Sequence, residues 1–320
     1  MNIKQLFAML VAASGLGMTV NVCAQNYPTH AVTVVIPFPP GGTLDTVGRL
    51  LAQKLGEQTG QSFIVENRAG AGGVIGANAV ARANPDGYTL LFSASTIATA
   101  PMVVKGVVYD VDADFQPVAL VAKAPLAVAV NKDLPAKDMA GLIAYSKANP
   151  GKLSFAIGSL ASAGHLSTEL LKRDSGMDYT VIQYKGSSPA YNDLIGGRIE
   201  GFIDPILGSA GFAKAGQLRV LAVTSESRVP SMPEIPTVGE TIKGYAFYSW
   251  YGLWAPAKMP TPIAEYLNAE VNKALASMGP KLSEQGLLMT PGTRQDFADF
   301  QKADMARAKQ IIVEGNIRAE

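Results

Sequence analysis

The sequence predicts an α/β protein in which helices flank mixed, mostly parallel sheets. Apolar, β-branched runs alternate with segments whose apolar residues recur at helical spacing, which is typical of βαβ units. Two apolar runs, at residues 118–130 and 245–254, are too long for one ordinary strand. With 320 residues, the chain is also long enough for two domains. We therefore expect two α/β domains joined by crossing strands.

The first part of the chain is expected to form three strands and two helices before the chain passes into the second domain. The expected strands are residues 32–36, 63–66 and 88–92, and the expected helices are residues 46–55 and 74–83. The turn signal Asn-Pro-Asp-Gly at residues 84–87 separates the second helix from the third strand. Within the run 118–130, Pro125 indicates that the strand passes from one sheet to another.

In the second part of the sequence, strands and helices continue to alternate, and the end of the chain is expected to return to the first domain. The expected helices are residues 139–148, 166–171, 188–195, 260–276 and 296–313, and the expected strands are 153–157, 180–184, 201–204 and 220–224. The aromatic run 245–254 is predicted to be the second crossing strand, so the two final helices complete the first domain. We therefore expect lobe 1 to comprise residues 25–123 and 251–320, and lobe 2 to comprise residues 124–250.

The N-terminal segment, residues 1–24, is predicted to be a signal peptide. Lys4 supplies a positive start, residues 6–20 are apolar, and Val22-Cys23-Ala24 has the small outer residues of a cleavage site. The apolar run is short for a transmembrane helix. Cleavage after Ala24 would leave a mature chain that begins near Gln25 in the periplasm.

Composition excludes several classes of function. Hydrophobic residues make up 48% and charged residues 17%, as in a globular chain. The formal net charge is +1 and no basic block occurs, which argues against nucleic acid and against an electrostatic membrane anchor. Cys23 is the single cysteine and would leave with the signal peptide. We therefore expect no disulfide, no metal and no cofactor in the mature protein.

Two loops far apart in the chain share the order strand, small residues, helix start. The first loop, residues 38–43, follows the strand 32–36, and the second loop, residues 159–164, follows the strand 153–157. Such loops direct unpaired N–H groups and the positive end of a helix dipole at one point. An anion held between two of them needs no cationic side chain, so the sequence predicts a binder of small carboxylates. The predicted contact residues are Phe38, Pro40, Gly41, Gly42, Thr43, Ser159, Ser162, Ala163 and Gly164.

Three further residues are predicted to discriminate the rest of the ligand. Asp204 ends a strand, which is where α/β proteins place ligands, and it would accept a hydrogen bond from a ligand hydroxyl or ammonium. Tyr184 and Tyr248 could stack on an aromatic acid, although core packing explains most aromatic stripes. The sequence therefore does not decide whether the ligand is an aliphatic or an aromatic acid.

Other residue patterns have simpler interpretations. Asp45 is predicted to cap the first loop's helix, and Ser159 and Ser162 could likewise serve as caps. His165 and Glu169 lie four residues apart and are predicted to form a local pair, because two ligands alone make no metal site. Arg68 and Arg198 could grip a second carboxylate, or lie at the surface.

A secreted hydrolase is the alternative from another functional class. It would use Ser159 and His165, with Asp204 as a third member. No nucleophile elbow, zinc-protease motif or paired-carboxylate motif accompanies these residues. We therefore predict that the protein is not an enzyme.

Six stretches in this order carry a family resemblance. They are PFPPGGTLD at 37–45, VENRAGAGG at 65–73, NPDGYTLL at 84–91, HLSTEL at 165–170, LRVLAVTS at 218–225 and WYGLWAP at 250–256. The chain resembles the Bug family, the periplasmic receptors of tripartite tricarboxylate transporters. The resemblance covers nearly the whole mature chain and implies a two-lobed, type II periplasmic-binding-protein fold that closes like a Venus flytrap on an organic acid.

The resemblance also implies partners and roles. In such receptors, the two loops pinch a carboxylate through backbone N–H groups and ordered water. We expect a monomer that passes its ligand to the membrane subunits of a transporter. A sensor subunit that presents its closed form to a membrane kinase is the alternative, which the sequence does not separate from transport.

Overall fold

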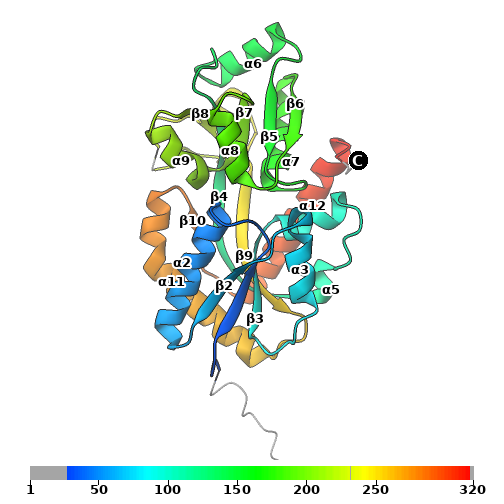
Figure 1. Cartoon of the computed structure of the whole chain (residues 1–320), viewed down its shortest axis with the longest axis vertical. Helices are drawn as coiled ribbons and strands as arrows, with labels where there is room; N and C mark the ends of the chain where they lie inside the picture. The colour runs from blue at the N-terminus through cyan, green and yellow to red at the C-terminus, as the bar shows by residue number, and fades with distance from the viewer. Residues whose placement is uncertain (1–26, 231, 318–320) are drawn as a thin grey trace, which may run out of the picture.

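The computed structural model describes residues 27–230 and 232–317, so the predicted signal peptide and its cleavage site lie outside the described residues. The described chain folds into two α/β lobes stacked along the long axis of the molecule (Figure 1). The predicted two-lobed α/β architecture is confirmed. None of the helices in this part of the chain has both the length and the hydropathy needed to cross a membrane.

Lobe 1 is built on a mixed sheet that includes three parallel strands. These are β1 (Val32–Ile36), β2 (Phe63–Asn67) and β3 (Thr89–Ala94), in the order β2-β1-β3. The antiparallel strands are β9 (Tyr248–Pro256), the first part of β4 (Phe115–Asn131) and the short β10 (Leu288–Met289). Val32 and Val34 on one face and Val35 on the other are all buried, because helices cover both faces.

The helices of lobe 1 form a layer on each face of this sheet. One layer contains α2 (Thr43–Thr59) and α11 (Thr261–Glu284). The other contains α3 (Val74–Ala81), α4 (Thr96–Val103), α5 (Val111–Asp114) and α12 (Arg294–Glu314), with the short 3₁₀ turn η1 (Ala71–Gly73) before α3. Helix α4 was not predicted, because nearly all its side chains are buried and it shows no polar face.

Lobe 2 repeats the same layered plan. Its parallel strands are β5 (Ser154–Ile157), β6 (Thr180–Gln183) and β7 (Gly201–Pro205), in the order β6-β5-β7, and β8 (Leu218–Val223) runs antiparallel to β4. One face carries α6 (Met139–Ala148), α7 (Ala163–Ser175) and α10 (Val238–Thr241), and the other carries α8 (Ser187–Ile195) and α9 (Ile206–Lys214). Both sheets are mixed, since β9 runs antiparallel to β3 in lobe 1 and β4 runs antiparallel to β7 in lobe 2. Of the two predicted crossing strands, only β4 pairs in both sheets, and β9 pairs in the sheet of lobe 1.

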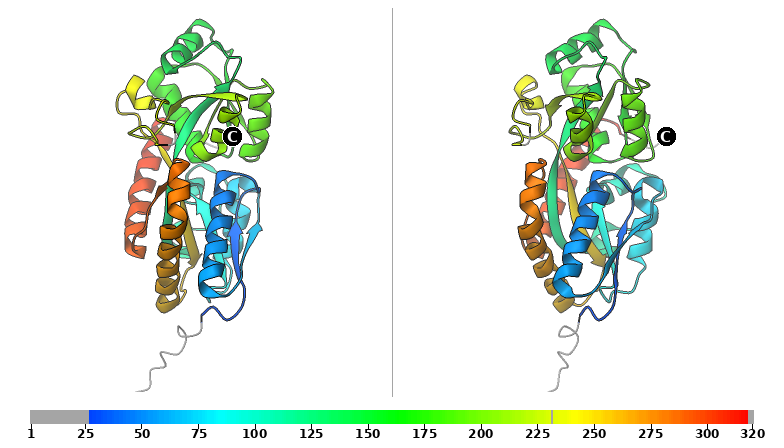
Figure 2. Two further views of the ribbon diagram at one scale, coloured as in Figure 1. Left: turned by 90° about the vertical axis from the view of Figure 1, so that its left-hand side faces the viewer. Right: turned by 60° about the vertical axis from the view of Figure 1, so that its left-hand side comes forward.

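Strand β4 passes through both lobes (Figures 1 and 2). Its residues up to Pro125 pair with β9, and its residues from Leu126 onward pair with β7 and β8. Thr224 fixes the place where the partners change: its Oγ1 accepts a hydrogen bond from the Leu126 amide (2.8 Å) and donates one to the carbonyl oxygen of Phe247 (2.6 Å). The predicted lobe boundaries themselves stay predictions.

Helix α12 contributes to the hydrophobic cores of both lobes. Phe297, near its start, packs with the tryptophans of β9, whereas Ile311 and Ile312, near its end, pack in a cluster of lobe 2. Figure 1 shows this helix rising along the lower lobe toward the upper one. The final helix therefore reaches beyond the lobe that it was predicted to complete.

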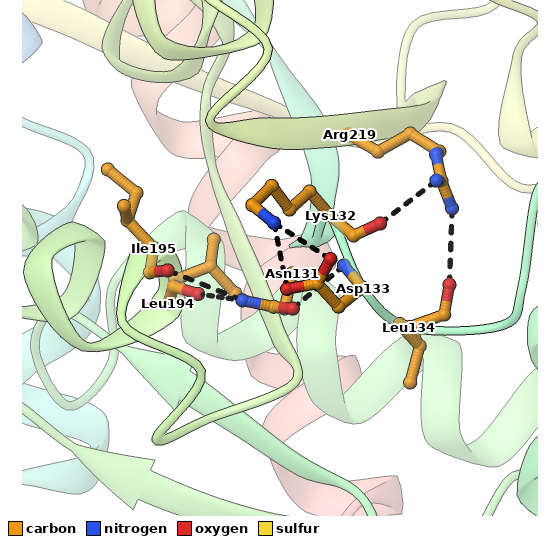
Figure 3. Close-up of polar contacts among 7 residues, drawn as sticks. All are labelled: Asn131, Lys132, Asp133, Leu134, Leu194, Ile195 and Arg219. Atoms are coloured by element: carbon orange, nitrogen blue, oxygen red, sulfur yellow. Dashed lines mark hydrogen bonds and ion pairs between the residues drawn. The ribbon is translucent and has the colours of Figure 1, made fainter.

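At the far end of lobe 2, side chains tie the end of β4 to its neighbours (Figure 3). The Asn131 amide donates to the carbonyl oxygen of Leu194, at the end of α8 (2.7 Å). The Arg219 guanidinium, on β8, donates to the carbonyl oxygens of Lys132 (3.0 Å) and Leu134 (3.2 Å). These bonds satisfy backbone carbonyls that no strand pairs.

Candidate functional site

A cleft of about 750 Å³, open to solvent, is lined by residues of both lobes. Strands β1, β3, β5, β6 and β7 all point their carboxyl ends at it, and each is followed by a helix, α2, α4, α7, α8 and α9 respectively, whose first residues or N-cap belong to the lining. Ligands of open α/β sheets bind at this edge. The positive ends of five helix dipoles therefore converge on one space.

The first loop presents the start of α2 without a side-chain cap. Its N-cap residue, Gly42, makes no side-chain hydrogen bond, so the first N–H groups of the helix stay available. Asp45 turns back and accepts hydrogen bonds from the Gly41 amide (3.1 Å), Asn67 Nδ2 (2.9 Å) and Arg49 Nε (2.9 Å). Burial opposes the charge of Asp45, but these donors lower its pKa overall. Asp45 therefore shapes the loop.

The second loop is held by its own hydrogen bonds. Ser162 Oγ accepts from the His165 amide (3.1 Å) and donates to the carbonyl oxygen of Ser159 (2.8 Å). His165 Nδ1 accepts from the amide of Ala161 (3.1 Å), whose φ of 59° is in the left-handed region. Burial lowers the pKa of His165 to about 4, so its ring is neutral near pH 7. The loop is a preformed structure with a neutral histidine as its support.

A third loop, residues 185–189, has the same form and was not predicted as part of the site. It joins β6 to α8, whose N-cap residue, Gly186, has a φ of 105° and no side chain to cap the helix. The Gly186 amide donates to the carbonyl oxygen of Gly158 (2.8 Å), which ties this loop to the start of the second loop. The signal was available in the sequence, since Lys-Gly-Ser-Ser stands between a predicted strand and a predicted helix.

Asp204 lies on the lobe 2 side of the cleft, at the end of β7. Its Oδ1 accepts from Ser187 Oγ (3.0 Å) and its Oδ2 accepts from the hydroxyl of Tyr191 (3.2 Å). No cation pairs with it among the described residues. Burial raises the pKa of Asp204 to about 7, although the two hydroxyls act in the opposite direction. A Cβ on Gly208 would lie 3.0 Å from its Oδ2, so this close packing requires glycine.

The lobe 1 side of the cleft carries two buried hydroxyls without hydrogen-bond partners within the described part of the chain. They belong to Thr43, at the start of α2, and Tyr251, on β9. The hydroxyls of Thr43 and Ser249 lie close enough to the Tyr251 hydroxyl to lower its pKa, but no hydrogen bond of good geometry joins them to it. Burial and the charge of Asp204 both raise the pKa of Tyr251. Buried unpaired hydroxyls are costly, so these two atoms mark a place where a partner is missing.

Eight of the predicted contact residues line this cleft. They are Phe38, Gly42, Thr43, Ser159, Ser162, Ala163, Gly164 and Asp204. Pro40 and Gly41 belong to the first loop but not to the lining, and the Gly41 amide is engaged by Asp45. Tyr184 also lies outside it, and its hydroxyl donates to Asp193 Oδ2 (2.8 Å).

Tyr248 faces away from the cleft, because side chains alternate along a strand. On β9, Ser249 and Tyr251 line the cleft, whereas Tyr248 and Trp250 line a separate cavity on the other side. The Tyr248 hydroxyl accepts a hydrogen bond from the amide of Glu226 (3.1 Å). Tyr248 therefore lies outside the lining of this cleft, and its predicted contact with the ligand stays a prediction.

The two arginines that were candidates for a second carboxylate form ion pairs outside the cleft. Arg68 pairs with Glu66, Arg198 pairs with Asp193, and neither arginine lines the cleft. Lys185 is the one cationic side chain of the lining.

The hydrolase arrangement of Ser159, His165 and Asp204 is not formed in the described structure. Ser159 Oγ donates to the carbonyl oxygen of Leu160 (3.2 Å) and not to the histidine. His165 Nδ1 is occupied by the loop backbone, and its Nε2 lies 3.9 Å from Glu169 Oε1. His165 and Glu169 are therefore neighbours on one helical face, but no hydrogen bond joins them and the neutral histidine forms no ion pair.

The two lobes touch each other around the cleft. Thr99 Oγ1, on α4, donates to the carbonyl oxygen of Ala161 in the second loop (2.6 Å). A Cβ on Gly72 would lie 3.1 Å from Ser159 Oγ, and one on Gly186 would lie 3.4 Å from Pro39 Cγ. Loops of the two lobes are therefore in contact beside the cleft.

Comparisons with known proteins agree on one family. The family model described as "Tripartite tricarboxylate transporter family receptor" matches residues 47–317. Protein BugT of Bordetella pertussis is 38% identical over 283 residues, which cover 87% of this chain and 86% of the relative.

Solved structures show the same fold. The structure described as R. palustris Rpa4515 with adipate has a TM-score of 0.89 at 38% identity and covers 91% of this chain and 99% of that one. MatC from Rhodopseudomonas palustris with bound malate has a TM-score of 0.84 at 31% identity and covers 89% of this chain and 100% of that one. The periplasmic binding protein BugD has a TM-score of 0.86 at 31% identity and covers 92% of this chain and 100% of that one. The expected two-lobed periplasmic-binding-protein fold of type II is confirmed.

Proposed function

Because the chain belongs to the tripartite tricarboxylate transporter receptor family, as its resemblance to the Bug receptors predicted, we propose that it captures a small organic carboxylate between its lobes for uptake. One observation carries the proposal: the N-terminal ends of five helices meet at a cleft whose lining has a single cationic side chain. Similar solved structures hold adipate and malate, which are both carboxylates.

The anion would be held mainly by backbone N–H groups from opposite lobes. The starts of α2 and α8, one from each lobe, have no side-chain cap, so their first N–H groups are available to an anion. Each helix end contributes about 0.3–2 kcal/mol and each charge-assisted hydrogen bond about 1.5–3 kcal/mol. Micromolar binding needs about 8 kcal/mol beyond association costs of at least about 4 kcal/mol, so four or so such bonds are required. No single helix end supplies them.

Binding would therefore be coupled to closure of the lobes. A ligand that contacts both lobes binds the closed form better than the open one and shifts the population toward it. The proposed contact residues are the eight predicted ones that line the cleft, together with Ser187 and Ser188 of the third loop and Ser249 and Tyr251 of β9. Tyr184 and Tyr248 are left out of this set.

The biological setting follows from the family. The receptor would reach the periplasm by cleavage after Ala24, act as a monomer and deliver its ligand to the membrane subunits of a tripartite transporter. We do not assign it a reaction, since its family is a receptor family and Ser159 and His165 are engaged in holding the second loop.

Thermal unfolding of the mature chain tests the proposal directly. We expect adipate, malate, succinate or benzoate to raise the melting temperature with saturation, because a ligand that binds only the folded state stabilises it. The matched control is the uncharged amide of each acid, which should have no effect at the same concentration. A panel in which no carboxylate outperforms its amide would refute the proposed function.

A further inference from the structure

We propose that a second cavity, on the opposite face of β9 from the cleft, is a regulatory site: a compact aromatic group that fills it holds the lobes together and strengthens ligand binding in the cleft. The inference rests on the proposed function and concerns the regulation of that site. This rear cavity has a volume of about 700 Å³ and is open to solvent.

The walls of the rear cavity come from both lobes. Leu166, on α7, and Phe247 belong to the hydrophobic core of lobe 2, whereas Trp250, on β9, and Phe300, on α12, pack in a core of lobe 1. Because opposite walls belong to different lobes, the volume of the rear cavity changes when the lobes move. An occupant therefore fits one arrangement of the lobes better than another, which is the condition for coupling to a second site.

The segments that join the lobes lie between the rear cavity and the cleft. Ser249 and Tyr251, on β9, line the cleft. Tyr248 and Trp250, which alternate with them along the strand, line the rear cavity. Thr224 Oγ1 binds both joining segments and so fixes the pivot there. With the pivot between the two spaces, separation of the lobes at the cleft brings the walls of the rear cavity together, and a group that fills the rear cavity opposes this movement.

The rear cavity also borders the second loop of the cleft. Thr99 lines the rear cavity, and its Oγ1 donates to the carbonyl oxygen of Ala161 in that loop (2.6 Å). Ala163, the first residue of α7, lines both the rear cavity and the cleft. The two spaces therefore share a wall, and this wall is the loop that is proposed to contact the anion.

The lining of the rear cavity favours an uncharged aromatic occupant. Asp304 accepts a hydrogen bond from an indole N–H (2.7 Å), Lys123 Nζ lies 4.3 Å from the centre of an aromatic ring, and Arg307 donates to a backbone carbonyl oxygen. The remaining charged residue of the lining, Glu226, is exposed. Since the inner charges are already engaged, an aromatic group enters at a lower desolvation cost than an ion. The aromatic residues of the lining are Phe247, Tyr248, Trp250 and Phe300.

A tethered benzyl group tests the inference. Ala308, on α12, lines the rear cavity, and the predicted mature chain has no cysteine of its own. Folded Ala308→Cys would be labelled with benzyl methanethiosulfonate, which forms a mixed disulfide that a reductant removes. The ligand would be whichever of adipate, malate, succinate and benzoate binds the parent protein most tightly.

We expect the label to lower the dissociation constant of this acid by three-fold or more, mainly through slower dissociation, and reduction to restore the original value. Calorimetry and stopped-flow dissociation measure the two quantities. An unchanged or weakened affinity would overturn the inference. A cysteine that fails to react would overturn it as well, because the rear cavity would then not admit a group of this size.

The matched control is Lys309→Cys with the same label, because this neighbouring residue of the same helix is exposed. Its affinity should not change. Methyl methanethiosulfonate on Ala308→Cys controls for the size of the group, and its effect should be smaller than that of the benzyl label. Equal effects of the benzyl label at both positions would contradict a role for the rear cavity.

Small-angle scattering without ligand separates this inference from the proposed function. Benzyl-labelled Ala308→Cys should have a smaller radius of gyration than its reduced form, because fewer molecules have separated lobes. An unchanged or larger radius would overturn the inference. If no carboxylate binds the parent protein but the label still makes the chain more compact, the proposed function fails and the coupling of the rear cavity to the lobes stands.

Discussion

At the residue scale, Asp204 couples the cleft to pH. Its carboxyl group is buried, it faces the hydroxyls of Ser187, Tyr191 and Tyr251, and Lys185 is the one cationic group in the surrounding lining. A folded-state pKa of about 7 lies above the ordinary value for aspartate, so the folded protein binds this proton more tightly than the unfolded chain. The contribution of Asp204 to stability is therefore greatest at low pH and is lost as pH rises toward 7.

Asp204→Asn should remove this pH dependence. Between pH 5 and pH 8 the unfolding free energy of the parent should fall relative to that of the variant, by at most about 3 kcal/mol. Chemical denaturation at both pH values, without ligand, measures the difference. Buried His165, whose pKa is lowered, has the opposite pH dependence, but it is present in both proteins and cancels. Parallel pH profiles for the two proteins would contradict the assignment of the titration to Asp204.

Gly164 illustrates how close packing limits residue choice in the second loop. A Cβ at this position would lie 2.5 Å from the carbonyl oxygen of Ile203, on β7. We expect Gly164→Ala to lower the unfolding free energy by about 1–3 kcal/mol, as overpacking does. Gly211→Ala is the control, because no atom lies within 4 Å of its Cβ and it sits inside helix α9. That change should stabilise by up to about 1 kcal/mol, and equal effects at both glycines would contradict the packing argument.

At the element scale, the start of helix α8 is the feature that the sequence interpretation missed. Ser188 occupies its first turn and lines the cleft, and that turn contains no acidic residue of its own. A Cβ on Gly41 would lie 3.6 Å from Ser188 Oγ, so this helix end also faces the first loop of the other lobe. Its dipole is therefore available to an anion that contacts both lobes.

Ser188→Asp places a fixed negative charge where the ligand carboxylate is proposed to bind. The unfolding free energy should stay within about 1 kcal/mol of the parent value or rise, because acids are favourable in a first helical turn. Carboxylate affinity should fall ten-fold or more, as measured by calorimetry. Ser188→Asn supplies a neutral side chain of the same size and should retain most of the affinity. Undiminished binding by Ser188→Asp would show that α8 does not face the anion.

At the scale of the whole molecule, loops of opposite lobes lie in contact beside the cleft. A Cβ on Gly72 would lie 3.1 Å from Ser159 Oγ, which is close enough for a disulfide between cysteines at these positions. Gly72 has a φ of 66°, which costs about 1–2 kcal/mol for another residue and is tolerable in one turn. The predicted mature chain has no cysteine of its own that would compete.

The double variant Gly72→Cys, Ser159→Cys should act as a lock. Oxidised before ligand is added, it should bind at least ten-fold more slowly than after reduction, because closed lobes bar entry to the cleft. Oxidised after ligand is added, it should retain the ligand through dialysis and release it when reduced. The two single variants are the controls, and rapid exchange in the oxidised double variant would contradict closure around the ligand.

Local chemistry allowed much of this protein to be predicted from its sequence. The alternation of strands and helices, the two loops with small residues and the position of Asp204 at a strand end all depend on neighbours along the chain. Periodicity, glycine and proline signals report such local conformation directly. They led to the family, the lobes and eight residues of the cleft lining.

Only the tertiary structure decided which of these features meet. Alternation along β9 separates Tyr248 from Tyr251, but only the position of lobe 2 determines that Tyr251 faces the ligand side. Likewise, Asp204 has a raised pKa and Thr43 has an unpaired hydroxyl because residues distant in sequence surround them. Burial and pairing are properties of packing between segments, and no periodicity within one segment specifies them.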